Sequence, residues 1–267
     1  MGATSSPTFG LVGNGQLGGA IATALLSTGV VDPARLWIAN RSGDRRSFAG
    51  VEGIRWTTEL AEIAAHCDVI LMALPPAAVA DVAFAAPDAL VVSVMAGIDA
   101  ARLARITSAR RVVRAMSNPA AALSLAYSPW FASSAVTAAD RALVRRLFEA
   151  CGTTDEVSEE GQIDCFTAVT GPVPGFVALF ADCMAQYAIG RGVAPAVAER
   201  AIRQLFLAAG TMLAASDRPA GDHVEEMIRY AGTTAAGLLD MQASGLADAI
   251  AHGLEAARLR ATTIGRD

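Results

Sequence analysis

A glycine-rich segment near the N-terminus has the spacing of a phosphate-binding loop. Residues 13–18 read GNGQLG, directly after the apolar run 8–12 and at the start of a helical pattern over 16–27. This context favours a dinucleotide site over a plain glycine turn, because phosphate oxygens can meet free N–H groups at the helix N-terminus. The three glycines would permit a tight turn, the approach of a pyrophosphate, and close helix–strand packing. The predicted cofactor residues in this loop are Gly13, Asn14, Gly15, Gln16, Leu17 and Gly18.

The residues after the next predicted strand, 36–39, indicate which dinucleotide binds. A site for NAD typically places Asp or Glu there to accept hydrogen bonds from the ribose 2′-hydroxyl. This chain has Asn40 instead, followed by Arg41 and Ser42. Because a guanidinium beside a hydroxyl suits a 2′-phosphate, the sequence predicts NADP(H). The alternative is that Arg41 is a solvated loop residue.

Three later strand ends are expected to face the same cofactor. Ligands of open α/β sheets lie outside the carboxyl ends of the strands. The residues predicted on this basis are Ala73, Leu74, Pro75, Met95, Ala96 and Asn118. Because a proline follows it, Asn118 is disfavoured in a helical conformation. Its amide would either contact cofactor or substrate, or cap the following turn, and both alternatives stay open.

A second anion site is indicated at Gly232-Thr233-Thr234. A glycine that opens a helix leaves the first N–H groups unpaired, so a carboxylate can be held there. A threonine hydroxyl adds a further donor. The alternative is an ordinary helix N-terminus with threonine as its cap.

The composition excludes several kinds of chemistry. The chain has 267 residues, 53% of them hydrophobic and 18% charged, which indicates a folded protein rather than a disordered one. Every basic residue is an arginine, so the chain can form neither a Walker A phosphate contact nor a Schiff base through lysine. The net charge of −5, without a basic patch, argues against a nucleic-acid partner.

The cysteines and histidines are too scattered for a metal site. Cys67, Cys151, Cys165 and Cys183 form no CxxC pair, so we expect no metal and free thiols in a cytoplasmic protein. No apolar run is long enough to span a membrane. The short polar stretch 1–7 does not resemble a signal peptide.

The hydrophobic pattern predicts two structural regions. In the first, apolar strands alternate with helices, which is typical of a parallel sheet covered on both faces. The second is all helical, with Gly and Pro between the helices. We therefore predict a Rossmann-like NADP-binding α/β domain over 1–158 and an all-α substrate and dimerisation domain over 159–267. Because its helices are apolar on several faces, the second domain is expected to form a homodimer.

The expected elements are as follows. Strands are predicted at 8–12, 36–39, 68–73, 89–94 and 111–115, with an edge strand at 153–157. Helices of the first region are predicted at 16–27, 59–65, 99–106 and 141–150. Helices of the second region are predicted at 160–169, 174–190, 195–215, 221–228, 232–243 and 246–262.

Taken together, these motifs resemble the pyrroline-5-carboxylate reductase family over nearly the whole chain. The most specific is AGTTAAGL at 231–238, which is similar to the family's Pro-Gly-Gly-Thr-Thr-x-x-Gly-Leu signature. The others are the glycine loop, NRS at 40–42, DVILMALPP at 68–76, SVMAG at 93–97, MSNP at 116–119 and TAVTG at 167–171. The resemblance implies a Rossmann domain, a helical domain whose helices interleave in a dimer, and higher assembly of such dimers.

The resemblance also implies an activity and a substrate site. The activity is NADPH-dependent reduction of a cyclic imine that carries a carboxylate, the last step of proline biosynthesis. The substrate residues would be Gly232, Thr233, Thr234 and Thr170. Of these, Thr234 is expected to donate to the ring nitrogen, with Thr233 in support. His223 is a weaker alternative as proton donor, because imidazole titrates near neutrality.

Three departures from the family pattern bear on the substrate. The family's Ser-Gly-Ser-Gly-Pro-Ala-Tyr appears as TGPVPGF at 170–176, which loses a hydroxyl, a glycine and a phenol. Pro75-Pro76 replaces the family's Lys-Pro, and Tyr230 stands where the family has proline. The altered loop keeps two alternatives open. One is a reductase of a different imine or ketone, and the other is a non-catalytic NADP-binding paralogue.

Overall fold

The chain forms two compact units. The computed structural model describes residues 6–264, except for the side chain of Asp81. One unit consists of Met1–Pro172 with Ala256–Asp267, and the other of Val173–Glu255.

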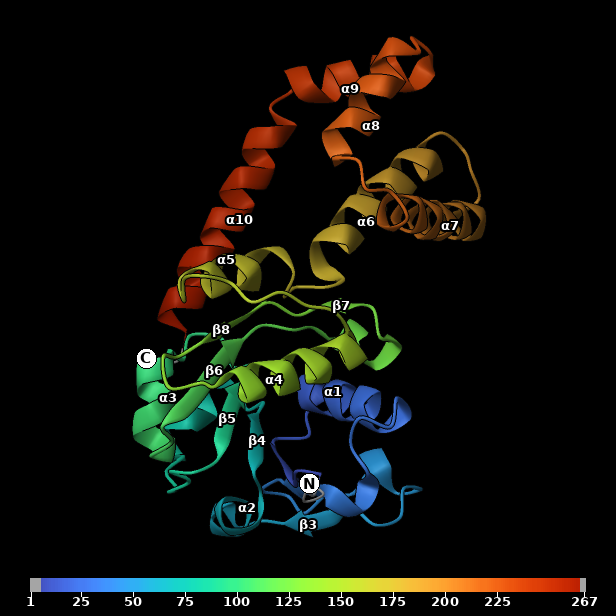
Figure 1. The fold of residues 1–267 in the computed structure, drawn as a ribbon. Helices are drawn as coiled ribbons and strands as arrows, with labels where there is room; N and C mark the ends of the chain where they lie inside the picture. The colour runs from blue at the N-terminus through green and yellow to red at the C-terminus, as the bar shows by residue number, and fades with distance from the viewer. Residues whose placement is uncertain (1–5, 265–267) are drawn as a thin grey trace. The chain divides into compact units, whose positions relative to one another are not determined.

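The first unit is built on a seven-stranded sheet (Figure 1). In sheet order its strands are β3 (Arg55–Thr57), β2 (Leu36–Ala39), β1 (Phe9–Val12), β4 (Val69–Met72), β5 (Leu90–Ser93), β6 (Arg111–Ala115) and β8 (Trp130–Ala132). All neighbours are parallel except β8, which runs antiparallel to β6. The strand order reverses between β1 and β4, which makes the carboxyl ends of β2, β1 and β4 the expected ligand crevice.

Helices cover both faces of this sheet. On one face α1 (Gln16–Ser27) and α4 (Ala138–Cys151) pack against Phe9 and Leu11 of β1. On the other, α2 (Leu60–His66) and α3 (Ala100–Thr107) pack against Ile70 and Val91. The continuous apolar runs of the central strands are buried because both of their faces are covered. The predicted Rossmann-like parallel sheet is confirmed.

Short 3-10 turns fill several of the connections. They are η1 (Pro33–Arg35), η2 (Arg46–Phe48), η3 (Pro76–Asp81) and η4 (Pro119–Leu123).

Helix α4 begins before residue 141, the start expected from its amphipathic pattern. Thr137 caps it in a capping box: the Asp140 amide donates to the Thr137 hydroxyl (3.2 Å), and the Thr137 amide donates to the Asp140 carboxylate (2.9 Å). This reciprocal pair satisfies two backbone donors and extends the helix to Ala138.

The expected edge strand at 153–157 is wrong in its extent. Only β9 (Gly152–Thr153) is a strand, and it pairs with β7 (Ala126–Tyr127) in a separate two-stranded sheet. Further along, Glu156 makes an isolated bridge with Trp130. The sheet is instead completed by β3 and β8, two short strands that the apolar pattern did not indicate.

The second unit is helical. It contains α6 (Gly175–Gly190), α7 (Pro195–Ala214), α8 (Ala220–Arg229) and α9 (Thr233–Ala243). Helix α6 packs on α7, and the rings of Phe180 and Phe206 meet edge to face there, with 6.1 Å between their centroids. Helix α8 packs on α9. Helix α10 (Leu246–Thr263) begins in this unit and ends in the first. These helices and α5 (Gln162–Val169) lie within two residues of their predicted bounds, because Gly and Pro punctuate each connection.

Residues 159–172 belong to the same compact unit as the sheet. Helix α5 lies in this segment, and Arg114 of β6 forms ion pairs with Asp164 and Glu160 there. The compact units therefore divide after Pro172, whereas the functional boundary at 158 stays a prediction.

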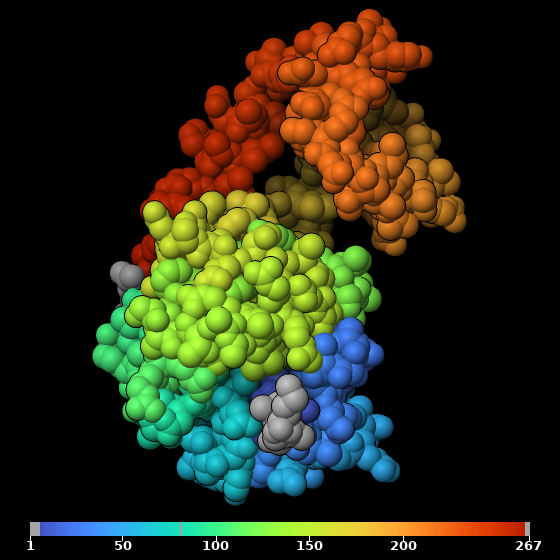
Figure 2. Space-filling view, in the orientation of Figure 1, coloured from blue at the N-terminus to red at the C-terminus, as the bar shows by residue number. Residues whose placement is uncertain are grey.

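Apolar side chains are widely exposed on the helices of the second unit, part of whose surface Figure 2 shows from one side. Leu179 and Leu207 are 64% exposed, and Met212 is 73% exposed. Exposed apolar area on this scale is typical of a surface that contacts another protein. Among the described residues, no helix combines the length and the apolar character needed to cross a membrane.

Candidate functional site

The glycine loop joins β1 to α1 at the point where the strand order reverses. Gly13 has a φ of +94°, and its amide donates to the carbonyl of Ala39 at the end of β2 (2.9 Å). A methyl group on Gly13 would lie 2.8 Å from the carbonyl oxygen of Ala73, so both the backbone conformation and the neighbouring strand require glycine.

The other two glycines of the motif have opposite surroundings. A methyl group on Gly18 would overlap the carbonyl oxygen of Gly13, so this glycine lets α1 pack against the loop. Around Gly15 there is open space, with no atom within 4 Å of a methyl group placed there. No side chain caps α1, and the Gly19 amide makes its first internal bond to the Gly15 carbonyl (2.8 Å). The amides of Gln16 and Leu17 thus border an open space that suits a phosphate.

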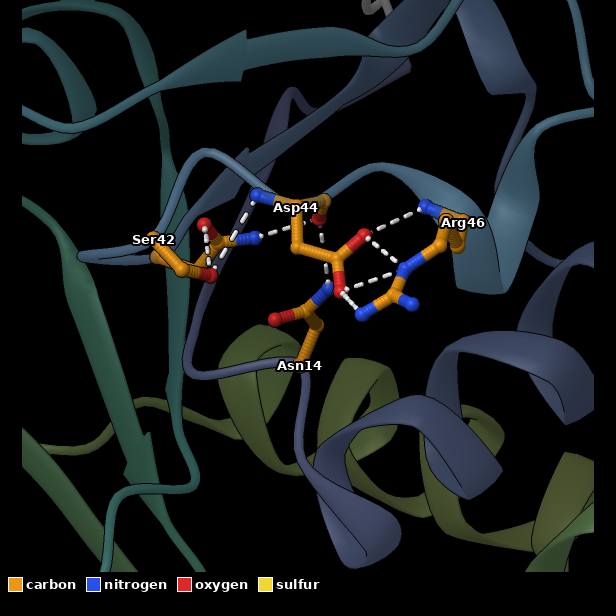
Figure 3. Close-up of polar contacts among 5 residues, drawn as sticks. Asn14, Ser42, Asp44 and Arg46 are labelled. Carbon is orange, nitrogen blue, oxygen red and sulfur yellow. Dashed lines mark hydrogen bonds and ion pairs between the residues drawn. The ribbon is translucent and has the colours of Figure 1, made fainter.

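The loop after β2 is held to the glycine loop by Asp44 (Figure 3). The main-chain carbonyl of Asp44 accepts hydrogen bonds from the side-chain amides of Asn40 (2.8 Å) and Asn14 (3.3 Å). Ser42 donates through its hydroxyl to the Asn40 side chain (3.4 Å) and accepts from the Asp44 amide (3.3 Å). Through these hydrogen bonds, Asn14 and Asn40 connect the glycine loop to the loop after β2.

The carboxylate of Asp44 binds Arg46. It accepts two hydrogen bonds from Nε (3.0 Å each), one from Nη2 (2.7 Å) and one from the Arg46 amide (2.9 Å). These bonds, the side-chain ones foremost, lower the pKa of Asp44 from 3.8 to about 2. Sequence reasoning missed this pair, although an acid two residues before an arginine in a glycine turn is a visible signal.

Arg41 stays free to contact a ligand. Its side chain is exposed, and it forms no hydrogen bond or ion pair with the other residues of the described range 6–264. A guanidinium without a partner, next to the exposed Ser42, is what a 2′-phosphate would require.

The end of β4 lies beside the glycine loop, and β5 is the next strand beyond β4 in the sheet. Ala73 donates to the Val12 carbonyl (2.9 Å), and the Leu74 side chain lies close to Gly13. On the next strand, the amide of buried Met95 donates to the Ser93 hydroxyl (3.2 Å), and partly buried Ala96 follows it. Pro75 is exposed. Of these, Ala73 and Leu74 contact the loop directly.

Asn118 caps the turn that follows it. Its side-chain oxygen accepts from the Ala120 amide (3.0 Å), and its side-chain nitrogen donates to the Thr170 carbonyl (3.0 Å). The capping alternative is therefore realised, in a residue that is 3% exposed. Thr170, at the end of α5, donates its hydroxyl to the Phe166 carbonyl (3.0 Å). A predicted cofactor residue and a predicted substrate residue are thus hydrogen-bonded to each other.

The predicted carboxylate site lies at the start of α9, in the second unit. Ala231 has a φ of +58°, Gly232 is extended, and no side chain caps the helix. The amides of Ala235 and Ala236 bond to the Gly232 carbonyl. Those of Thr233 and Thr234 have no acceptor among the described residues, and both threonine side chains are exposed. The helix start therefore offers two amides and two hydroxyls to a ligand.

Tyr230 and His223, which the sequence also singled out, precede this helix start in the chain. The ring of Tyr230 lies 3.5 Å from where a methyl group on Gly232 would be, and the residue is 83% exposed. His223 hydrogen-bonds Ser216 through Nε2 (3.0 Å). That contact holds His223 at the start of α8.

The two buried thiols are not poised to react at neutral pH. Burial raises the pKa of Cys67 and of Cys151 to about 12, so both remain protonated at neutral pH. The described part of the chain contains no group of His, Cys, Asp or Glu that could hold a metal ion.

Comparisons with known proteins place this site in a family. The family model for pyrroline-5-carboxylate reductase dimerisation matches residues 160–264, and that for NADP oxidoreductase, coenzyme F420-dependent, matches residues 8–97. The pyrroline-5-carboxylate reductase of Pseudomonas aeruginosa is 30% identical, over 97% of this chain and 97% of its own length.

Solved structures show the same fold. The pyrroline-5-carboxylate reductase of Coxiella burnetii has a TM-score of 0.84 at 24% identity, covering 97% of this chain and 99% of its own. The pyrroline carboxylate reductase of Plasmodium falciparum, solved with NADP bound, has a TM-score of 0.81 at 21% identity, covering 97% and 98%. On the strength of the sequence relatives, which span both units, the chain belongs to the pyrroline-5-carboxylate reductase family.

Proposed function

We propose that the protein reduces pyrroline-5-carboxylate to proline by hydride transfer from NADPH. The observation that carries this proposal is the uncapped start of α9, where the amides of Thr233 and Thr234 lack acceptors among the described residues. The family model for the dimerisation domain covers this helix, and the named relatives are reductases of this substrate.

The residues of the first unit fit NADP(H). The open space at Gly15 and the uncapped start of α1 suit a pyrophosphate, and Arg41 with Ser42 suits the 2′-phosphate. When bound, the nicotinamide supplies the hydride. Through Asp44, the side chains of Asn14 and Asn40 hold the two phosphate-binding loops together.

The residues of the second unit fit an imino acid. The amides at the start of α9 would hold the ring carboxylate. The Thr234 hydroxyl would donate to the ring nitrogen, with Thr233 in support. From the first unit, the family resemblance adds Thr170 to the substrate residues; its hydroxyl oxygen can still accept a hydrogen bond while it donates to Phe166. A protonated imine is already electrophilic, so binding and orientation supply most of what the reaction needs.

A second candidate is a reductase of a different imine or ketone. Pro172 and Val173 follow Thr170 where the family has a serine and a glycine. This loop would shape the pocket, and proline also removes a backbone donor. The altered loop is therefore the observation that favours a changed substrate.

We also propose a homodimer formed through the helices of the second unit. Their exposed apolar side chains, such as Leu179, Leu207 and Met212, support it. So does the match to the dimerisation model. The cytoplasmic location expected from the sequence stays a prediction.

The test is a steady-state assay with NADPH and a panel of cyclic imines. Pyrroline-5-carboxylate is compared with pyrroline-2-carboxylate, piperideine carboxylates and simple ketones. The highest kcat/KM is expected for pyrroline-5-carboxylate. A higher kcat/KM for another compound would favour the second candidate. Tight NADPH binding without oxidation by any compound would indicate a non-catalytic protein.

A further inference from the structure

A buried arginine in the sheet is not among the residues assigned to the proposed reaction so far. Arg114 lies on β6, is 4% exposed, and forms ion pairs with Asp164 and with Glu160, whose Oε1 lies 3.5 Å away. Its Nε has no hydrogen-bond partner in the described structure. A buried guanidinium is unfavourable unless acids compensate its charge, so these two partners are essential to its placement.

Both acids belong to the segment that leads to Thr170. Glu160 precedes α5, and Asp164 lies in its first turn. The Oε1 atom of Glu160 also accepts the Ala100 amide at the start of α3 (2.7 Å). Arg114 therefore ties the beginning of α5 to β6, and Glu160 extends this link to α3.

The other end of α5 is tied to the same strand. Asn118, which follows β6, donates to the Thr170 carbonyl (3.0 Å). Because the Asn118 oxygen also accepts the Ala120 amide, its side chain has a fixed orientation. Strand β6 and the residues after it thus hold α5 at both ends. Arg114 holds its start through ion pairs, and Asn118 holds its end through the hydrogen bond to Thr170.

We propose that Arg114 is a positioning residue for the substrate site. Through Asp164 and Glu160 it sets the position of α5, so that the bond between Asn118 and Thr170 forms and Thr170, a proposed substrate residue, is held in place. This inference rests on the proposed function.

The main test is Arg114→Met, a substitution of similar length without charge. The kcat/KM for the imino acid should fall by roughly 10- to 100-fold, because small displacements of positioning groups have effects of this size. The loss should appear mainly as a higher KM for the imino acid. The Kd of NADPH, measured by nicotinamide fluorescence, should change far less, since the glycine loop follows β1, and two strands, β4 and β5, lie between β1 and β6 in the sheet. Arg114→Lys should restore part of the activity.

A matched control is Arg141→Met. Arg141 also forms an ion pair in this unit, with Glu156 (2.8 Å), but it does not contact α5 through it. If kcat/KM falls as much in Arg141→Met as in Arg114→Met, the effect is a general destabilisation of the unit and the proposal is overturned. The same holds if the Kd of NADPH rises in Arg114→Met as much as the KM for the imino acid. The proposal is also overturned if Arg114→Met folds and has the kinetics of the wild type. If Arg114→Met does not fold, Asp164→Asn decides, because it keeps the charge of Glu160 beside Arg114.

Hydrogen exchange provides a readout that needs no substrate. Amides of residues 162–170 should exchange faster in Asp164→Asn than in the wild type, and unchanged exchange would overturn the proposed tie. If the wild type reduces no imino acid, the proposed function fails, whereas this measurement still decides whether Arg114 holds α5.

Discussion

At the scale of single residues, the start of α9 concentrates the chemistry on very few atoms. Ala231 turns the chain with a positive φ, and Gly232 enters the helix extended and without a capping side chain. In most helices a Ser, Thr or Asp at the cap would use the first amides. Here the threonines stand one and two residues later, so their hydroxyls and the amides are both available to a ligand.

Removing one of those hydroxyls should slow the proposed reaction. In Thr234→Ala we expect kcat/KM for the imino acid to fall roughly 100-fold, in line with the loss of one positioned donor. Thr234→Ser is the matched variant, because it keeps the hydroxyl and should retain most of the activity. Steady-state kinetics at saturating NADPH measure both. Unchanged kinetics in Thr234→Ala would mean that another group donates to the ring nitrogen.

The cofactor preference can be tested at one arginine. In Arg41→Ala the KM for NADPH should rise much more than that for NADH, because only NADPH carries the 2′-phosphate that this guanidinium would bind. The control is Arg146→Ala, which removes the same charge from an exposed position on α4. An equal effect of Arg41→Ala on both cofactors would refute the assignment of Arg41.

At the scale of elements, residues 40–46 act as one folded turn rather than as a flexible loop. Gly43 supplies a positive φ (+64°), Asp44 joins Asn14 to Asn40 through its carbonyl, and Arg46 is bound by the Asp44 carboxylate. The turn is therefore ordered before any ligand arrives, which lowers the entropy cost of binding.

The charge of Asp44 should depend on Arg46. In Arg46→Gln the pKa of Asp44 should rise from about 2 towards its ordinary value of 3.8, because the guanidinium hydrogen bonds are lost. Since the folded-state pKa lies below the unfolded one, the pair stabilises the fold fully above about pH 4. That contribution is lost as the pH falls towards 2. The pKa of Asp44 in the wild type and in Arg46→Gln is measured from the carboxyl carbon chemical shift in an NMR pH titration. A pKa that stays near 2 in Arg46→Gln would show that other groups hold the carboxylate.

Local patterns were enough to predict most elements. Strands β2 and β6 and helix α1 match their predicted bounds, because apolar runs and Gly or Pro punctuation are local signals. Strands β3 and β8 were missed: each has only three residues, and pairing with a neighbour rather than an apolar run makes them strands. The start of α4 was missed because its capping box precedes the amphipathic pattern.

At the scale of the whole molecule, what the sequence could not predict is which distant residues meet. The GNGQLG loop and the GTT helix start are local motifs, and they were identified directly. The bond between Asn118 and Thr170 joins residues 52 positions apart, and that between Arg114 and Asp164 joins residues 50 apart. Such pairs follow from the contacts of α5 with β6 and with the residues after β6, which no local pattern encodes. The resemblance of the motifs to the family predicted the roles of the site residues, whereas these contacts between distant residues are visible only in the structure.

The exposed apolar side chains of the second unit bear on how the protein assembles. Its helices expose many large apolar side chains, among them Leu207 at 64% and Met212 at 73%, which is typical of a surface that contacts another protein. Fully burying one such side chain stabilises an interface by roughly 1.5–3 kcal/mol. Placing a charge in that interface costs more, because the carboxylate would be desolvated without a partner.

Leu207→Glu should therefore shift the protein from dimer to monomer. Light scattering after size-exclusion chromatography should give twice the mass of one chain for the wild type and a lower, concentration-dependent mass for the variant. Leu125→Glu is the matched control: Leu125 is 74% exposed but lies in the first unit, so the same substitution there should leave the dimer intact. A monomeric wild type, or equal dissociation in both variants, would mean that the exposed face of α7 does not form the interface.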